Sequence, residues 1–348
     1  MRKDISRHWF VLLVLVLSLL LTAGSARAAG FYKGKVIRVI VGFSPGGGFD
    51  THARTLARHL SKYIPGKPTI IVDNMGGAGS LKAANYISRV SKPDGLTIGM
   101  VSGATVMGQL LGRKGIKFDV RKFEIIAAPT PYKTVCVLSK ASGITSLEKW
   151  KNSKRPVKFG MTGPGASAHD VPLVLNAALG LPVKPVPGYK GTSKVRLAVE
   201  SGEVDGTCFA WDSMKATWKA KLESGALIPV IQTFKTKQPD LPNVPNAIDL
   251  AKTPEARALI EMGIHAPGMV NRYYTLPPKT PKDRVSILRK AFLAAFKDPA
   301  FLADAKKARL EIEPLTAAEV SKNMEALFSM KPALAKKLKK IIARKAIR

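Results

Sequence analysis

The chain has 348 residues, 46% of them hydrophobic, which is enough for two domains with substantial cores. Its two cysteines exclude a disulfide-dense scaffold and a multi-thiolate metal site, and its five histidines show no metal-ligand spacing. Lysine and arginine outnumber the acidic residues by 56 to 24, and the formal net charge of +32 favours small anions. No nucleic-acid-binding motif accompanies this charge, so we expect no nucleic acid as a partner.

The N-terminus has the three parts of an export signal. Arg2, Lys3 and Arg7 are basic, residues 9–21 form an apolar run, and Ala26-Arg27-Ala28 offers a cleavage site. Thirteen apolar residues are too few for an ordinary transmembrane helix. We therefore expect a signal peptide over residues 1–28 and a periplasmic mature chain, with an uncleaved anchor as the alternative.

The first strand–turn–helix unit of the mature chain is rich in glycine. Residues 36–41 are apolar and mostly β-branched, which predicts a buried strand of a parallel sheet, and Gly46, Gly47 and Gly48 then form a turn. A helix follows, with Asp50 as its expected N-cap. Backbone N–H groups at such a helix start can hold an anion. A purely structural corner is the alternative. A dinucleotide fingerprint is disfavoured, because Thr51 replaces its third glycine.

Two more units with the same order of elements follow. Strands are predicted at 69–72 and 96–101, and each leads through small residues, 74–79 and 102–105, into a helix. Successive units of this kind predict a parallel sheet whose loops converge at the carboxyl ends of its strands.

A second α/β module begins near residue 132. Its strands are predicted at 134–138, 157–161, 183–186, 204–211 and 227–231, and its glycine-rich loops at 162–167 and 187–193. Two such modules predict a bilobal α/β protein with loops facing one cleft. Cys136 and Cys208 lie on strands that could be neighbours, so a disulfide and two buried free thiols both remain open.

Helices dominate the rest of the chain. They are predicted at 254–262, 281–296, 299–310 and from Thr316, which forms a capping box with Glu319, to the C-terminus. Residues 331–348 contain eight basic residues, no acidic one and an apolar stripe of Leu334, Leu338 and Ile341. This predicts a basic amphipathic helix, either solvated or docked on anionic lipid.

The ordered motifs resemble the receptor subunits of tripartite tricarboxylate transporters, the Bug family. They read IRVIVGFSPGGGFDTHAR, VDNMGGAGS, PDGLTIGMVS, FGMTGPGASAH, GYKGTS, SGEVDG, LPNVP, PPKTPKDRV and KDPAF, and they cover nearly all of the mature chain. Three departures indicate a divergent branch: Met75-Gly76 and Ser80 stand where the family more often has Arg-Pro and Gly, and the strand from Gly206 is less apolar. Residues 254–274 fit the pattern least well.

The resemblance implies an α/β fold of the type II periplasmic binding proteins, with two lobes built on central mixed sheets around a ligand cleft. Residues 29–131 would form lobe 1, residues 132–250 lobe 2, and residues 251–348 would return to lobe 1 with C-terminal helices. Such a receptor captures an organic carboxylate as a monomer, without cofactor, metal or catalytic residues, and delivers it to membrane permease subunits. An exported sensor that signals to a membrane partner is the alternative, followed by an exported enzyme that acts on a carboxylate.

The resemblance also implies the ligand contacts, which come from loops of both lobes. Lobe 1 would supply Gly46, Gly47, Gly48, Phe49 and Asp50, then Ser102, Gly103, Ala104 and Thr105. Lobe 2 would supply Gly163, Gly165, Ala166 and Ser167, then Tyr189, Lys190, Gly191 and Thr192, and finally Asp205. The position of Trp211 at a strand end suggests a pocket wall. Phe49 is equally suited to the core, and Ser167 is expected as a cap or a ligand hydroxyl, because the G-x-S-x-G elbow of a nucleophile is absent.

Overall fold

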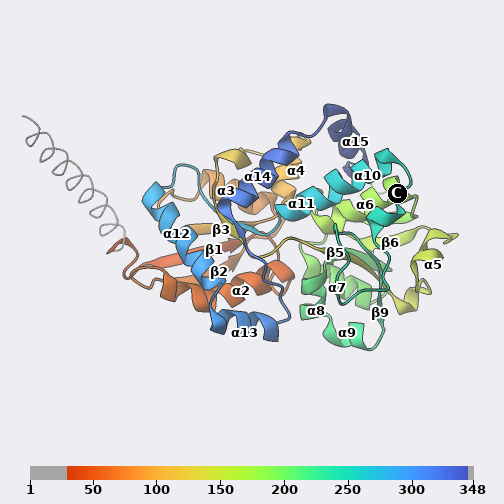
Figure 1. The fold of residues 1–348 in the computed structure, drawn as a ribbon, viewed down its shortest axis with the longest axis horizontal. Coiled ribbons are helices and arrows are strands. Elements are labelled where there is room, and N and C mark those ends of the chain that lie inside the picture. Colours follow the sequence, from red (N-terminus) through yellow and green to blue (C-terminus); the bar gives the residue numbers. More distant parts are fainter. Residues whose placement is uncertain (1–29, 344–348) are drawn as a thin grey trace, which may run out of the picture.

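The computed structural model describes residues 30–343. The predicted signal peptide therefore lies outside the described residues. Two sheets, each covered by helices, form two lobes that lie side by side (Figure 1). Within residues 30–343, no helix combines the length and the apolarity that crossing a bilayer requires.

The first sheet has six strands and is mixed. Its spatial order is β11 (Leu315–Thr316), β4 (Glu124–Ala128), β10 (Tyr273–Leu276), β3 (Thr97–Val101), β1 (Val36–Val41) and β2 (Thr69–Asn74). Strands β2, β1 and β3 are parallel, as predicted, whereas β10 runs antiparallel to both β3 and β4. Both β4 and β10 were missing from the sequence prediction.

The second sheet has five strands, all of them predicted. Its order is β7 (Val183–Val186), β6 (Val157–Gly160), β8 (Gly206–Ala210), β5 (Thr134–Ser139) and β9 (Leu227–Gln232). Strand β5 pairs antiparallel with β8, in a register that sets Cys136 opposite Cys208. These two buried cysteines form a disulfide, which resolves the alternative that the sequence left open.

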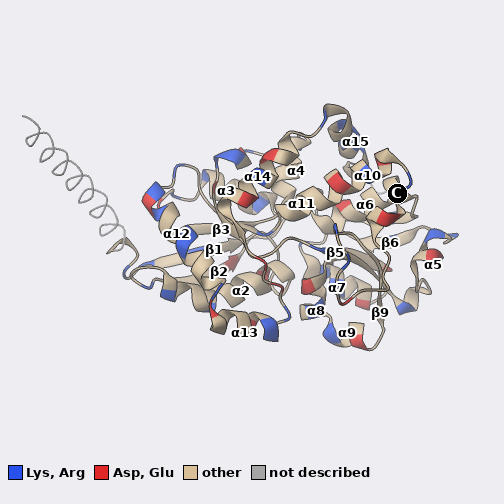
Figure 2. Cartoon of the chain, viewed as in Figure 1, with Lys and Arg blue, Asp and Glu red and all other residues tan. Residues whose placement is uncertain are grey.

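Helices cover both sheets. On the first lobe they are α2 (Gly48–Leu60), α3 (Leu81–Arg89), α4 (Ala104–Leu110), α12 (Lys282–Ala295), α13 (Pro299–Lys307) and α14 (Ala317–Phe328). On the second they are α5 (Leu147–Lys151), α6 (Ser167–Leu179), α7 (Thr192–Glu200), α8 (Trp211–Thr217), α9 (Lys219–Glu223) and α10 (Pro254–Ile260). The short α11 (Ala266–Met269) contacts α4 and α14. Basic residues lie on elements of both lobes (Figure 2).

The C-terminal region differs from the sequence prediction. The capping box of Thr316 and Glu319 is present, but the helix that it starts ends at Phe328. A second helix, α15 (Pro332–Ile342), begins with proline at its first position, where the missing N–H costs nothing. Helices α10 and α15 both contact α6 of the second lobe, while β10 and β11 belong to the sheet of the first lobe.

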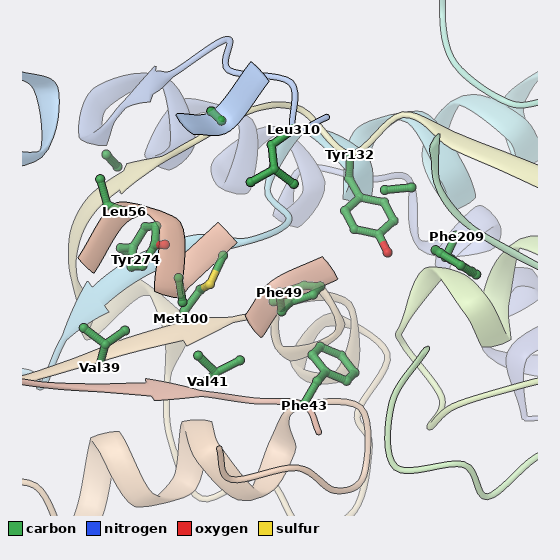
Figure 3. Close-up of a cluster of buried hydrophobic side chains, with 14 of the residues drawn as sticks. Val39, Val41, Phe43, Phe49, Leu56, Met100, Tyr132, Phe209, Tyr274 and Leu310 are labelled. Atoms are coloured by element: carbon green, nitrogen blue, oxygen red, sulfur yellow. The ribbon is translucent and has the colours of Figure 1, made fainter. Parts of the chain in front are cut away.

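Two crossover segments join the lobes. Residues 129–133 lead from β4 to β5, and the chain returns through α10, a π-helical turn (Glu261–His265) and α11 to β10. The crossovers lie against each other, because Tyr132 N donates to Gly268 O at 2.9 Å. Figure 3 shows Tyr132 between Phe49 of the first lobe and Phe209 of the second. All three belong to one buried hydrophobic cluster, so the core runs through the crossovers.

Candidate functional site

The loops at the carboxyl ends of the strands face one another between the lobes. The first lobe contributes the loops after β1, β2 and β3, and the second those after β6, β7 and β8. Helices α2, α6 and α7 start directly after three of these loops. Parallel strands place their carboxyl ends at one edge of a sheet, so the arrangement follows from the strand order of each lobe.

Glycine occupies the closest contacts between the two sets of loops. A Cβ atom placed on Gly163 would lie 2.5 Å from the backbone nitrogen of Gly79, and one on Gly191 would lie 2.2 Å from Ser44 Oγ. Neither glycine has a left-handed φ, so approach of the opposite lobe, rather than local backbone conformation, requires glycine there. The hydroxyl groups of Ser44 and Ser193 form a 2.9 Å hydrogen bond across the same contact.

Two arginines add further polar links between the lobes. Arg113 Nη1 donates to the carbonyl oxygen of Ala78 in the first lobe at 3.0 Å and to that of Pro164 in the second at 2.7 Å. From α7, Arg196 Nη2 donates to Gly46 O in the first loop at 3.1 Å. The lobes are therefore in direct contact at both ends of this set of loops.

Predicted residues line a small cavity behind the loop contacts. Gly103 and Ala104 from the first lobe face Gly165 and Ser167 from the second, and the polar residues Asp170 and Asn271 also line it. Its volume, counted as the space open to the centres of water molecules, is about 20 Å³. One water molecule needs about 10–15 Å³ on this measure, so the cavity in this arrangement has room for about one water molecule and not for an organic ligand.

The loop contacts bring together most of the other predicted glycines. Gly47 and Gly48 approach Thr192 and Ser213, respectively, across the cleft. Other predicted residues flank these contacts: Gly46 O accepts from Arg196, Gly191 lies against Ser44, and Lys190 O lies beside Gly76. Ser102 Oγ accepts from Ala104 N, and buried Ala166 precedes α6.

An acid in the following helix braces a glycine-rich loop in each lobe. Asp50 Oδ2 accepts from Gly46 N at 2.9 Å, and Arg54 Nε donates to both Asp50 oxygens. Asp50 is not the N-cap that we predicted, because α2 begins two residues earlier, at Gly48. In the second lobe, Asp170 Oδ1 accepts from Gly165 N at 2.8 Å.

Four predicted contact residues do not line the cavity, and their side chains contact other residues. The Phe49 ring packs on Phe43 and Tyr132, Thr105 Oγ1 bonds to Tyr273, the Tyr189 hydroxyl bonds to Glu203, and Trp211 Nε1 donates to Asp240. Phe49 therefore belongs to the core, which was the alternative that the sequence offered.

Asp205 needs a correction. It precedes β8, so it lies at the opposite end of this strand from the cleft, and it pairs with Arg155 at 2.7 Å. It also accepts a backbone hydrogen bond from Lys158. This carboxylate is structural and has no part in the cleft.

A buried charged cluster beside the crossovers was missed by the sequence analysis. Arg272, which immediately precedes β10, is fully buried and donates to both oxygens of Asp212, at 2.7 and 3.0 Å. It also contacts Ser213 Oγ and His52 Nε2, at 2.5 and 2.8 Å. His52 and Arg272 come from the first lobe, and Asp212 and Ser213 from the second. The sequence alone gives no sign of this cluster, because its members lie up to 220 positions apart in the chain.

The cluster holds one full charge of each sign. Burial raises the pKa of Asp212, but Arg272 and His52 more than offset this effect, so the carboxylate is ionised. Burial and the charge of Arg272 lower the pKa of His52, which keeps this ring neutral. The guanidinium of Arg272 also lies over the Tyr132 ring, 4.6 Å from its centroid. The cluster therefore ties both lobes to a crossover.

Metal ligands do not gather in the part of the chain that the structure describes. Among residues 30–343, no group of three or more His, Cys, Asp and Glu side chains is arranged to hold a metal ion.

Comparison with known proteins identifies the family. The family model described as "Tripartite tricarboxylate transporter family receptor" matches residues 52–337. The chain belongs to this receptor family. A similar sequence is a UPF0065 protein of Bordetella pertussis, 29% identical over 298 residues, which cover 83% of this chain and 84% of the relative. The UPF0065 protein of the tcbD-tcbE intergenic region of a Pseudomonas species is 26% identical and covers 72% of this chain and 74% of its own.

Solved structures confirm the predicted fold. The periplasmic binding protein BugD superimposes with a TM-score of 0.73 at 22% identity, covering 89% of this chain and 98% of its own. MatC from Rhodopseudomonas palustris, solved with bound malate, has a TM-score of 0.70 at 20% identity, and the match covers 88% of this chain and 99% of MatC. Another R. palustris protein, solved with adipate, has a TM-score of 0.71 at 20% identity, and the match covers 88% of this chain and 97% of that protein. The chain thus has the two-lobe fold of periplasmic binding proteins.

Proposed function

We propose that this receptor binds a small organic carboxylate between its lobes in the periplasm and delivers it to membrane permease subunits. The observation that carries the proposal is the convergence of the starts of α2, α6 and α7 on one cleft. A carboxylate that leaves water must regain its hydrogen bonds, and helix-start N–H groups supply them from a rigid scaffold. Family membership and the malate- and adipate-bound neighbours support the same ligand class.

The charged cluster is poorly suited to catalysis. His52, Asp212 and Ser213 are each at most 4% exposed, so a substrate has no access to them in this arrangement. Their polar atoms are also committed to Arg272, which holds Ser213 Oγ and both Asp212 oxygens. A serine that is to act as a nucleophile needs an adjacent base and an open face. Binding without covalent chemistry is therefore the function that the geometry favours.

A thermal-shift screen of the mature chain tests the proposal. The panel contains mono- and dicarboxylates, amino acids, sugars and nucleotides. A ligand at one hundred times its Kd stabilises the folded state by about 2.7 kcal/mol, so a binder raises the Tm visibly. We expect shifts only with carboxylate-bearing compounds. No shift with any of them, or a shift confined to sugars or nucleotides, contradicts the proposal.

A substitution opposite the first loop tests the position of the site. Gly191→Val would place its Cβ 2.2 Å from Ser44 Oγ and 3.0 Å from Ser44 N in that loop, so the lobes of this variant cannot close on a ligand. We expect its ligand-induced shift to disappear while its circular-dichroism spectrum stays that of the wild type. An unchanged shift would move the site away from this loop.

A further inference from the structure

The cavity between the lobes contains an acidic side chain, although an anion receptor gains nothing from a negative charge there. Asp170 lies in the first turn of α6, is 4% exposed and lines the cavity together with Ser167 and Asn271. A buried carboxylate repels a ligand carboxylate unless a hydrogen-bond donor lies between them.

The hydrogen bonds of Asp170 use only one of its two oxygens. Gly165 N and His169 Nδ1 both donate to Oδ1, each at 2.8 Å. Across residues 30–343, Oδ2 receives no hydrogen bond, and neither lysine nor arginine forms an ion pair with Asp170. Arg113 donates through Nη1 to the carbonyl oxygens of Ala78 and Pro164, and its charge interacts with that of Asp170 without a hydrogen bond between them.

In the first lobe, both oxygens of the equivalent acid accept hydrogen bonds. Asp50 also braces its own glycine loop, but Arg54 donates to both of its oxygens, and Gly46 N adds a third hydrogen bond. The first loop therefore carries a neutralised acid, whereas the second presents an acceptor to the cavity. The two glycine-rich loops therefore differ in the charge and in the free acceptor atoms beside them.

We propose that Asp170 Oδ2 accepts a hydrogen bond from a protonated amine of the ligand, so that the receptor selects amino-substituted carboxylates over plain ones. The inference rests on the proposed function and names its substrate class. The ligand carboxylates would take the helix-start N–H groups, and the ammonium would lie against Asp170 beside Ser167. Hydrogen bonds between charged partners are the stronger kind, and a site with a buried acceptor rejects an analogue that lacks the donor.

Matched ligands and matched variants test the proposal by isothermal titration calorimetry. L-Aspartate and succinate share a four-carbon dicarboxylate skeleton and differ by the amine. Asp170→Asn keeps an oxygen that can accept from Gly165 N and removes the charge. Asp298→Asn removes a buried acid that caps α13, outside the cavity lining, and serves as the control. The wild type and the control are expected to bind L-aspartate at least tenfold more tightly than succinate, and Asp170→Asn to bring the two affinities within about threefold.

The ratio of the two affinities is the decisive readout, because a purely structural role of Asp170 would change both affinities together. If the wild type binds succinate as tightly as L-aspartate, or if Asp170→Asn leaves the ratio unchanged, the amine subsite is overturned and the carboxylate receptor stands. If neither these acids nor any other carboxylate of the panel binds, both proposals fail.

Discussion

Closure of the lobes depends on the absence of a single methyl group at residue 163. In Gly163→Ala, the new Cβ would lie 2.5 Å from the backbone nitrogen of Gly79 and 2.7 Å from the carbonyl carbon of Ala78. Ordinary contacts begin near 3.4 Å, so the loops must separate by about 1 Å at this point. Both clashing atoms belong to the backbone, which cannot turn away as a side chain can.

Overpacking of this kind costs roughly 1–3 kcal/mol, and here the cost falls on the closed state alone. Since each 1.4 kcal/mol corresponds to a factor of ten, we expect ligand affinity to fall by about 5- to 150-fold. Titration calorimetry with a carboxylate found in the thermal screen measures this loss. Gly30→Ala is the matched control, because a Cβ at that exposed position meets nothing within 4 Å. Wild-type affinity in Gly163→Ala would refute the argument that the ligand-bound form needs these loops in contact.

Two further predictions concern stability and use urea unfolding. Arg272→Met should lower the free energy of unfolding by about 3–5 kcal/mol, because it strands the buried carboxylate of Asp212, and adding Asp212→Leu should restore most of the loss. Equal losses of unfolding free energy in the single and double variants would show that the unpaired charge of Asp212 is not the cause. Replacing Cys136 and Cys208 by alanine should cost about 4 kcal/mol, from the entropy of a loop closed across 72 positions. We also expect dithiothreitol to destabilise the wild type and to leave the alanine variant unaffected, and an equal effect of dithiothreitol on both would trace it to something other than this bond.

The regular parts of the fold were predictable because local patterns determine them. The β-branched run over Val36–Val41 forms β1 with the predicted bounds, and the Thr316–Glu319 capping box starts α14. Strand β10 was missed because its partners β3 and β4 lie far away in sequence, and because no repeated strand–loop–helix unit contains it. Its antiparallel place between β3 and β4 has no local signature.

The parts of the site that backbone loops form were predictable from the sequence. The contacts between side chains that lie far apart in the sequence were not. Glycines at helix starts mark the loops of both lobes, and the contacts at Gly163 and Gly191 confirm that these loops face one another. By contrast, the full burial of Arg272 depends on its ion pair with Asp212 of the other lobe, which is 60 positions away in the sequence. Asp205 misled us because it stands before its strand, whereas ligand loops of this fold stand after theirs.

The charged cluster and the glycine contacts should therefore serve different steps of one motion. Arg272 ends one crossover and lies over Tyr132 of the other, so a rotation of the lobes about these segments displaces it least. Gly163 meets Gly79 at a contact between loops of opposite lobes, which a rotation of the lobes would separate. Hinge motions concentrate backbone changes in the connecting segments and move the lobes as bodies. A substitution at Arg272 should consequently change unfolding with little effect on the angle of closure, whereas one at Gly163 should change ligand affinity and leave the stability of each lobe intact.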